Sequence, residues 1–185
     1  MSMKNNLNEW NIVDLLSHSR HDWMNKLQLI KGNLSLQKYE RVNDIIEEVI
    51  MEAQHESKLC NLKMPEFASY LLTYNWNKHH LLLEYEILGD VRSLEPFDES
   101  VTQWSRSFLD ILENTVDRCS ENHVSITIDL DSDKAGVRFF FDFNGIINKT
   151  DQIENWLKAV DHSRLVVNEY HVDTYELTTV ISFGI

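Results

Sequence analysis

Residues 17–33 of the chain read SHSRHDWMNKLQLIKGN. Around them, apolar side chains recur at intervals of three, four and seven residues, which predicts an amphipathic helix with a narrow apolar seam. The same segment contains His18 and His21, which lie outside the seam and are either solvated surface residues or parts of a functional site. The seam consists of Ile12, Leu16, Trp23, Leu27, Ile30 and Leu34.

A second helix of the same kind is predicted over about residues 40–62. A short turn must join the two helices, so they form an antiparallel hairpin. The turn falls either at Gly32-Asn33 or at residues 37–40, and the continuation of the seam to Leu34 favours the later position. Two helices cannot cover both seams, so we expect a second copy to complete a four-helix bundle, which makes the protein a homodimer. The seam of the second helix consists of Val42, Ile46, Val49, Ala53 and Cys60.

The hydrophobic pattern changes after Pro65, which is predicted to end the hairpin and to separate a helical domain, residues 1–64, from a second domain, residues 65–185. This pattern indicates an α/β sandwich in which helices cover one face of a single sheet. Its helices are predicted over residues 67–77, 100–119 and 151–160. Its strands are predicted over residues 81–88, 123–131, 137–143, 164–172 and 175–183, with a hairpin turn at residues 132–136.

The composition is that of a globular protein: of 185 residues, 43% are hydrophobic and 25% are charged. Thirty acidic residues against 17 basic ones give a net charge of -13, which disfavours binding to nucleic acid and to anionic membranes. The start of the chain lacks the apolar core of a signal peptide, and no segment approaches the roughly 20 apolar residues of a membrane span. We therefore expect a cytoplasmic protein.

The cysteines and the remaining histidines form no pattern typical of a metal site. Cys60 and Cys119 belong to no CxxC pair and are expected to be buried free thiols. None of the remaining histidines has an HxxxH or HExxH spacing, so no metal centre is expected. Those of the second domain are His79, His80, His123, His162 and His171.

The first helix has a polar face opposite its seam. With an advance of about 100° per residue, the seam lies near 210° from His21, so this imidazole points away from the core. Asn25, Gln28 and Gly32 fall within about 40° of His21 and form a flat polar stripe. Together with Leu29 and the neighbouring His18, they are predicted to dock a partner protein. His18 lies about 60° from His21 and competes with it as the reactive residue.

The residues around His21 suit phosphoryl transfer. An exposed imidazole is mostly neutral near pH 7 and can then attack phosphorus. Asp22 could fix the tautomer of the ring or take its second proton. Arg20 and Lys26 could neutralise phosphoryl oxygens, and positioning with charge neutralisation supplies most of the catalysis in such reactions. Spacing alone leaves open whether the histidine is functional.

The segment RHDWMNKLQLIKGNLSL, followed by KYERV, resembles the phosphoacceptor box of two-component histidine kinases. It is more closely similar to the sporulation-initiation phosphotransferase B family of the bacterial sporulation phosphorelay. The close likeness covers about residues 16–62, with weaker similarity in WNKHHLLLEYEILG and SENHVSITI. The resemblance implies that His21 carries the phosphoryl group, that His18 belongs to the docking face, and that the hairpin turns just before the YER segment.

The second domain bears on whether the protein uses ATP. FLDILENTVDRCSENHVSITIDL resembles the kinase helix that carries a magnesium-binding asparagine, here Asn114, although a purely structural role for this residue is favoured. The glycine-rich loops that cover a nucleotide are missing, because FFFDFNGII contains only Gly145. We therefore expect a degenerate kinase-like ATPase fold without a working nucleotide site.

Without ATP, the phosphoryl donor must be another protein. The resemblance implies an aspartyl phosphate on a single-domain response-regulator receiver as the donor, and the receiver of a sporulation transcription factor as the acceptor. The Mg²⁺ used in transfer would be held by the receiver, so this chain would need no cofactor of its own. Two alternatives stay open: a cytosolic histidine kinase with a divergent ATP site, and a dimeric adaptor without catalytic activity.

Overall fold

The computed structural model describes residues 11–131, 136–159 and 165–183. The chain forms two compact units, residues 1–53 and 54–185, and α2 passes from the first into the second. The helices are α1 (Ile12–Ser35), α2 (Tyr39–Asn61), α3 (Pro65–Tyr74), the 3-10 turn η1 (Glu95–Phe97), α4 (Asp98–Glu113) and α5 (Thr150–Ala159). The strands are β1 (Leu82–Leu88), β2 (His123–Asp129), β3 (Arg138–Asn144), β4 (Val166–Val172) and β5 (Glu176–Ser182).

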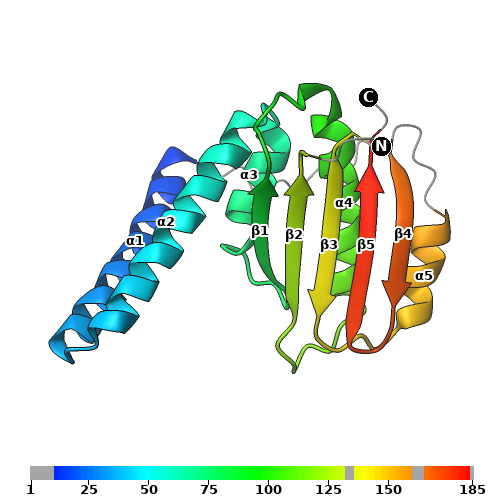
Figure 1. Ribbon diagram of the computed structural model, residues 1–185. Coiled ribbons are helices and arrows are strands. Elements are labelled where there is room, and N and C mark those ends of the chain that lie inside the picture. Colours follow the sequence, from blue (N-terminus) through cyan, green and yellow to red (C-terminus); the bar gives the residue numbers. More distant parts are fainter. Residues whose placement is uncertain (1–10, 132–135, 160–164, 184–185) are drawn as a thin grey trace. The chain divides into compact units, whose positions relative to one another are not determined.

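The first unit is the predicted helical hairpin, with α1 beside the first part of α2 (Figure 1). The side chain of Asn11 caps α1 by accepting the backbone N–H of Asp14 at 3.0 Å. At the other end, the N–H of Leu36 donates to Gly32 O, and Gln37 adopts a φ of 55°. The chain therefore turns after Leu34, near the later of the two predicted positions, and Gly32 lies within the last turns of the helix.

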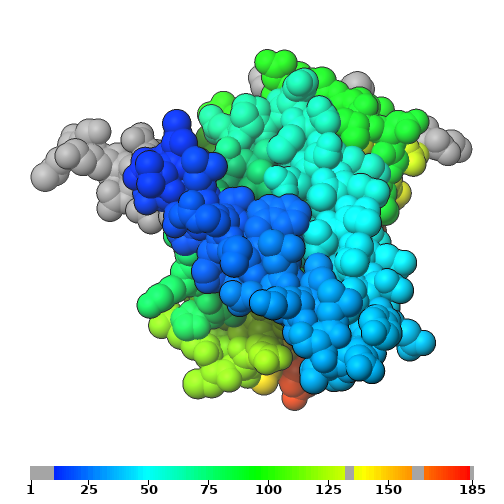
Figure 2. Space-filling model, turned by 90° about the vertical axis from the view of Figure 1, so that its left-hand side faces the viewer, coloured from blue at the N-terminus to red at the C-terminus, as the bar shows by residue number. Residues whose placement is uncertain are grey.

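The apolar seam of the hairpin is open to solvent in the single chain. No residue of α1 is buried, and Trp23 and Leu27 are 52% and 53% exposed. On α2, Val42 is buried, whereas Ile46 and Ile50 are 40% and 50% exposed. Figure 2 shows these two helices side by side at the surface, α1 in dark blue and the start of α2 in lighter blue. As the sequence predicts, two helices alone leave much of both seams uncovered.

The second unit is the predicted sheet with helices on one face. Its strand order is β1-β2-β3-β5-β4, with β1 and β2 parallel and the other pairs antiparallel. Figure 1 shows α3, α4 and α5 behind the sheet. Along β3, Phe139, Phe141 and Phe143 point inward and are at most 1% exposed, whereas Asp142 faces solvent. This alternation is typical of a strand that is covered on one face only.

Three sequence interpretations differ from the structure. Pro65 does not end the hairpin, because α2 ends at Asn61 and the proline occupies the first turn of α3, where its missing N–H has no helical partner. The helix predicted to reach Cys119 ends at Glu113, where Asn114 caps it. The two cysteines, predicted to be buried, are free but exposed.

A few predictions fall on parts of the chain that the structure does not describe. They concern most of the hairpin turn at residues 132–136, the end of the helix at residue 160, the start of the strand at residue 164, and His162. For the described residues, the strands begin and end within two residues of their predicted bounds.

Candidate phosphoacceptor site

The exposed face of α1 presents His21 to solvent. Its side chain is 72% exposed, in agreement with the helical periodicity that directs it away from the seam. His18, one turn earlier, is only partly exposed, although its position about 60° from His21 predicted that it is exposed as well. The structure therefore separates the two candidate histidines and leaves His21 as the more accessible imidazole.

The contacts of His21 gather on one ring nitrogen. The carboxylate oxygen Oδ1 of Asp22 lies 3.6 Å from His21 Nδ1, and the side-chain amide nitrogen of Asn25 lies 3.3 Å from the same atom. Sequence reasoning predicted the first neighbour and assigned Asn25 only to partner docking. Its spacing of four residues from His21 is the signal for a contact on one helix face.

The predicted basic residues lie in different surroundings. Lys26 Nζ forms an ion pair with Glu52 of α2, and it lies 5.7 Å from the centroid of the Trp23 ring. The ammonium group is thus tied to the neighbouring helix of the hairpin. Arg20 is exposed on the other side of His21. The structure brings neither cation into direct contact with the imidazole, so their predicted role in neutralising phosphoryl oxygens stays a prediction.

The predicted docking residues share the surface of α1 with His21. Asn25, Gln28, Leu29 and Gly32 are all exposed. A Cβ atom added to Gly32 would meet no other atom within 4 Å, so the fold itself has room for a side chain there. Because Gly32 has no side chain, the surface of the helix is flat at this point, as the predicted docking surface requires.

In the second unit, packing accounts for the residues that resemble a nucleotide site. The side-chain nitrogen of Asn114 donates to Asp110 O at 2.8 Å and so closes the end of α4. A Cβ atom on Gly145 would lie 2.4 Å from Asn122 Oδ1 and 2.6 Å from Phe143 Cζ. Close packing of these neighbours therefore explains the glycine at this position, and a role in binding nucleotide phosphates is not needed to explain it.

A pocket of about 400 Å³ lies where β1 and β2 begin. It is lined by residues that include His79, His80 and His123. The ring of His79 stacks on Tyr74 with centroids 4.0 Å apart, and the side chain of Asn122 is held by backbone groups on both of its polar atoms. These contacts give the histidine ring and the asparagine a structural role.

Within the described residues, no helix combines the length and the apolar character that a membrane span needs.

Comparison with known proteins identifies the family. The family model described as "Sporulation initiation phospho-transferase B, C-terminal" matches residues 63–184, and "Sensor_kinase_SpoOB-type, alpha-helical domain" matches residues 1–62. The chain belongs to the sporulation initiation phosphotransferase B family. The sporulation initiation phosphotransferase B of Bacillus subtilis (strain 168) is 48% identical over 134 residues, which are 72% of this chain and 70% of that protein.

Two solved structures match the chain with low similarity. A bacterial phosphotransferase matches 94% of this chain and 98% of its own, with 11% identity and a TM-score of 0.38. The Acinetobacter baumannii histidine kinase AdeS matches 89% of this chain and 97% of its own, with 8% identity and a TM-score of 0.35.

Proposed function

We propose that this protein is a phosphorelay histidine phosphotransferase. His21 accepts a phosphoryl group from the aspartyl phosphate of one response-regulator receiver and passes it to the aspartate of a second. The observation that carries the proposal is the exposed imidazole of His21, whose Nδ1 faces Asp22 and Asn25. The family to which the chain belongs supports the same reaction class.

The contacts at Nδ1 favour Nε2 as the nucleophile. When Nδ1 carries the ring proton, the negative charge of the Asp22 carboxylate, 3.6 Å away, favours this tautomer, and Asn25 turns its amide oxygen towards the proton. The lone pair on Nε2 is then available. This lone pair attacks phosphorus, an N–P bond forms, and the P–O bond to the receiver's carboxylate breaks, with its electron pair leaving on that carboxylate. The proton remains on Nδ1, so the phosphorylated ring is a cation that the Asp22 carboxylate stabilises.

The second transfer is the reverse of the first. The carboxylate of another receiver attacks phosphorus, and the N–P bond breaks to return the neutral imidazole. Phosphohistidine and aspartyl phosphate are both high-energy phosphoryl carriers, so one histidine can accept and donate in turn. We expect the receivers to supply the Mg²⁺. We also expect Arg20 to approach the phosphoryl oxygens, and Lys26 to do so once its ion pair with Glu52 has broken.

We further propose that the protein needs no ATP and acts as a cytoplasmic homodimer. Packing explains both Asn114 and Gly145, which are the residues that resemble a kinase nucleotide site. The exposed seam around Trp23 and Leu27 fits a second copy of the hairpin, which would complete a four-helix bundle. The docking face of Asn25, Gln28, Leu29 and Gly32 then lies on the outside of the bundle.

The decisive experiment compares two phosphoryl sources. Purified protein is incubated with a receiver domain carrying radiolabelled aspartyl phosphate, and separately with radiolabelled ATP and Mg²⁺. We expect label on the protein from the receiver only, and its passage to a second, unlabelled receiver when that is added. Labelling from ATP alone would favour the alternative of a histidine kinase with a divergent nucleotide site.

Variants locate the site and test the adaptor alternative. His21→Ala should abolish labelling, while His18→Ala should still be labelled. The opposite result would move the phosphoacceptor to His18. If His21→Ala left relay from the first receiver to the second intact, the protein would act as a non-catalytic adaptor.

A further inference from the structure

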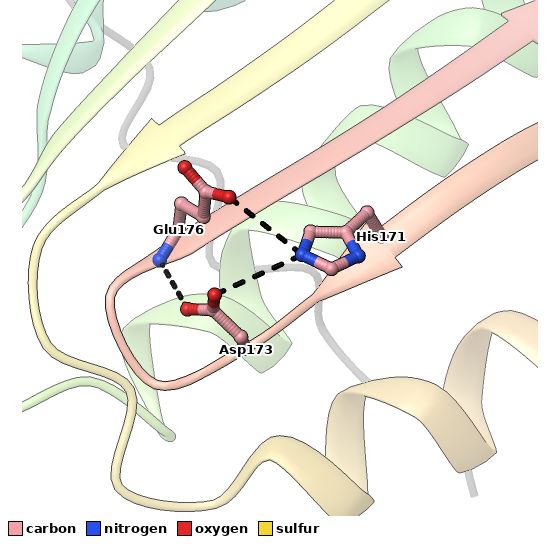
Figure 3. A group of neighbouring side chains, drawn as sticks. All are labelled: His171, Asp173 and Glu176. Carbon is pink, nitrogen blue, oxygen red and sulfur yellow. Dashed lines mark hydrogen bonds and ion pairs between the residues drawn. The ribbon is translucent and has the colours of Figure 1, made fainter.

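The hairpin between β4 and β5 gathers three side chains that can bind metal ions (Figure 3). His171 Nε2 lies 3.7 Å from Asp173 Oδ2 and 3.6 Å from Glu176 Oε1. One donor atom from each of the three residues lies within 4.8 Å of the other two. Separations above about 3.5 Å are too long for direct hydrogen bonds, so the three groups face a common space between them.

The turn of the hairpin holds Asp173 in place for this arrangement. Its Oδ1 accepts the backbone N–H of Tyr175 at 2.6 Å and that of Glu176 at 2.9 Å. The other oxygen, Oδ2, is left to face His171. The same two backbone hydrogen bonds hold the pKa of the Asp173 carboxyl below its ordinary value.

We propose that His171, Asp173 and Glu176 form a binding site for a divalent transition-metal ion, with Zn²⁺ as the best match. Zinc binds imidazole nitrogen and carboxylate oxygen at about 2.0–2.2 Å, and donors on a tetrahedron of that size are about 3.3–3.6 Å apart. The two separations from His171, 3.6 and 3.7 Å, are close to this size, whereas the two carboxylates, whose donor atoms lie within 4.8 Å of each other, can move together as the ion binds. The site is exposed, so water can complete the coordination.

The donor set also discriminates between metals. Mg²⁺ and Ca²⁺ prefer oxygen ligands alone, whereas an imidazole with two carboxylates suits Zn²⁺ and its first-row neighbours. Sequence reasoning expected no metal centre, because His171 belongs to no HxxxH or HExxH spacing. The three residues meet only because the chain reverses between β4 and β5 at residues 173–176.

Titration calorimetry of the full chain with zinc chloride, in a buffer that does not bind metals, tests the proposal. We expect one Zn²⁺ per chain at this site, and no displacement by excess Mg²⁺. His171→Ala and Asp173→Asn should each weaken this binding at least about tenfold. Asp173→Asn is the sharper variant, because its amide oxygen can still accept the two backbone N–H groups of the turn while the anionic oxygen is lost.

His123→Ala provides the matched control, since His123 is an exposed histidine on another strand of the same sheet. It should bind zinc as the wild type does. Circular dichroism of each variant checks that the sheet is intact. Zinc binding that is equally strong in His171→Ala, or that excess Mg²⁺ removes, would overturn the proposal, as would the absence of saturable binding by the wild type.

Discussion

Gly32 is a residue that the proposed docking surface of α1 explains and the fold does not. Alanine in a helix interior is favoured over glycine by about 0.8–1 kcal/mol, and a Cβ atom at this position would meet nothing within 4 Å. The fold would therefore gain stability from a side chain here. The close approach of a partner protein to the helix would explain why this position is a glycine.

We predict that Gly32→Ala raises the thermal stability of the protein and slows phosphoryl transfer from the receiver, because the added methyl group separates the two surfaces. Denaturation curves and transfer rates at several receiver concentrations measure the two effects. Asn43→Ala, at an exposed position of α2, is the control and should leave transfer unchanged. Transfer at the wild-type rate in Gly32→Ala would exclude Gly32 from the contact.

Asp22 carries the next prediction. The variant Asp22→Asn keeps the shape of the side chain but removes the charge, 3.6 Å from Nδ1, that is proposed to stabilise the phosphorylated imidazolium. We expect transfer onto His21 to be about 10- to 100-fold slower, with unchanged helix content. Rapid-quench measurements with a labelled receiver give the rate. Asp44→Asn, on the exposed face of α2, removes an equal charge and should have little effect; equal losses in both variants would reduce Asp22 to a general electrostatic role.

The sequence predicts the contacts that lie within one helix of this site, but not those between its two helices, and the reason is physical. Helical periodicity alone places His21 opposite the seam, because the angle between residues of one helix depends only on their spacing. The ion pair of Lys26 with Glu52 depends on how α1 and α2 are aligned. That alignment is set by the turn at Gln37, whose positive φ no spacing rule identifies.

At the scale of elements, α3 begins with a cap that comes from a distant part of the chain. Met64 precedes the helix and has no capping side chain, and Pro65 has no N–H to satisfy. The carboxylate of Asp98 accepts the N–H of Glu66 at 3.0 Å and that of Phe67 at 2.9 Å. A negative charge at this end also interacts favourably with the helix dipole.

We predict that Asp98→Ala destabilises the protein by about 2–4 kcal/mol, because it leaves two helix N–H groups without acceptors in a buried place. Asp98→Asn retains one acceptor oxygen and should lose roughly half as much. Urea denaturation followed by circular dichroism measures both values. Equal stability of Asp98→Ala and wild type would mean that water replaces the carboxylate.

The edge strand β1 is protected by side chains from two helices. Asn75, which follows α3, donates to Leu83 O at 2.7 Å and accepts the N–H of Leu83 at 3.0 Å. Further along the strand, His55 Nδ1 accepts the N–H of Ile87 at 3.0 Å and Lys58 donates to Ile87 O at 3.2 Å. These side chains occupy backbone groups through which an open sheet edge could pair with another chain.

Alternation of polar and apolar residues was enough to predict the strands, since it records which face of the sheet is buried. It could not predict the cap by Asp98 or the cover by His55. Both contacts join residues more than 30 positions apart, and they exist only after the helices have packed on the sheet. The misinterpretation of Pro65 has a local cause, since proline is compatible both with the end of one helix and with the first turn of the next.

At the scale of the whole molecule, the uncovered seam of the hairpin predicts self-association. Leu27 and Leu29 are both 53% exposed in the single chain, but only the first belongs to the seam. Replacement of either leucine by glutamate should therefore lower the stability of the single folded chain by a similar amount. Burial of leucine between two copies contributes about 1.5–3 kcal/mol, and a buried unpaired carboxylate would oppose association further.

We predict that Leu27→Glu converts the proposed homodimer into a monomer, whereas Leu29→Glu is dimeric and is impaired only in transfer from the receiver. Sedimentation equilibrium over a range of concentrations measures the association, and the transfer assay measures the docking face separately. A dimeric Leu27→Glu would show that the seam is not the interface. Dissociation of Leu29→Glu would mean that association uses the face assigned to receivers, so that the bundle and the docking surface could not form together.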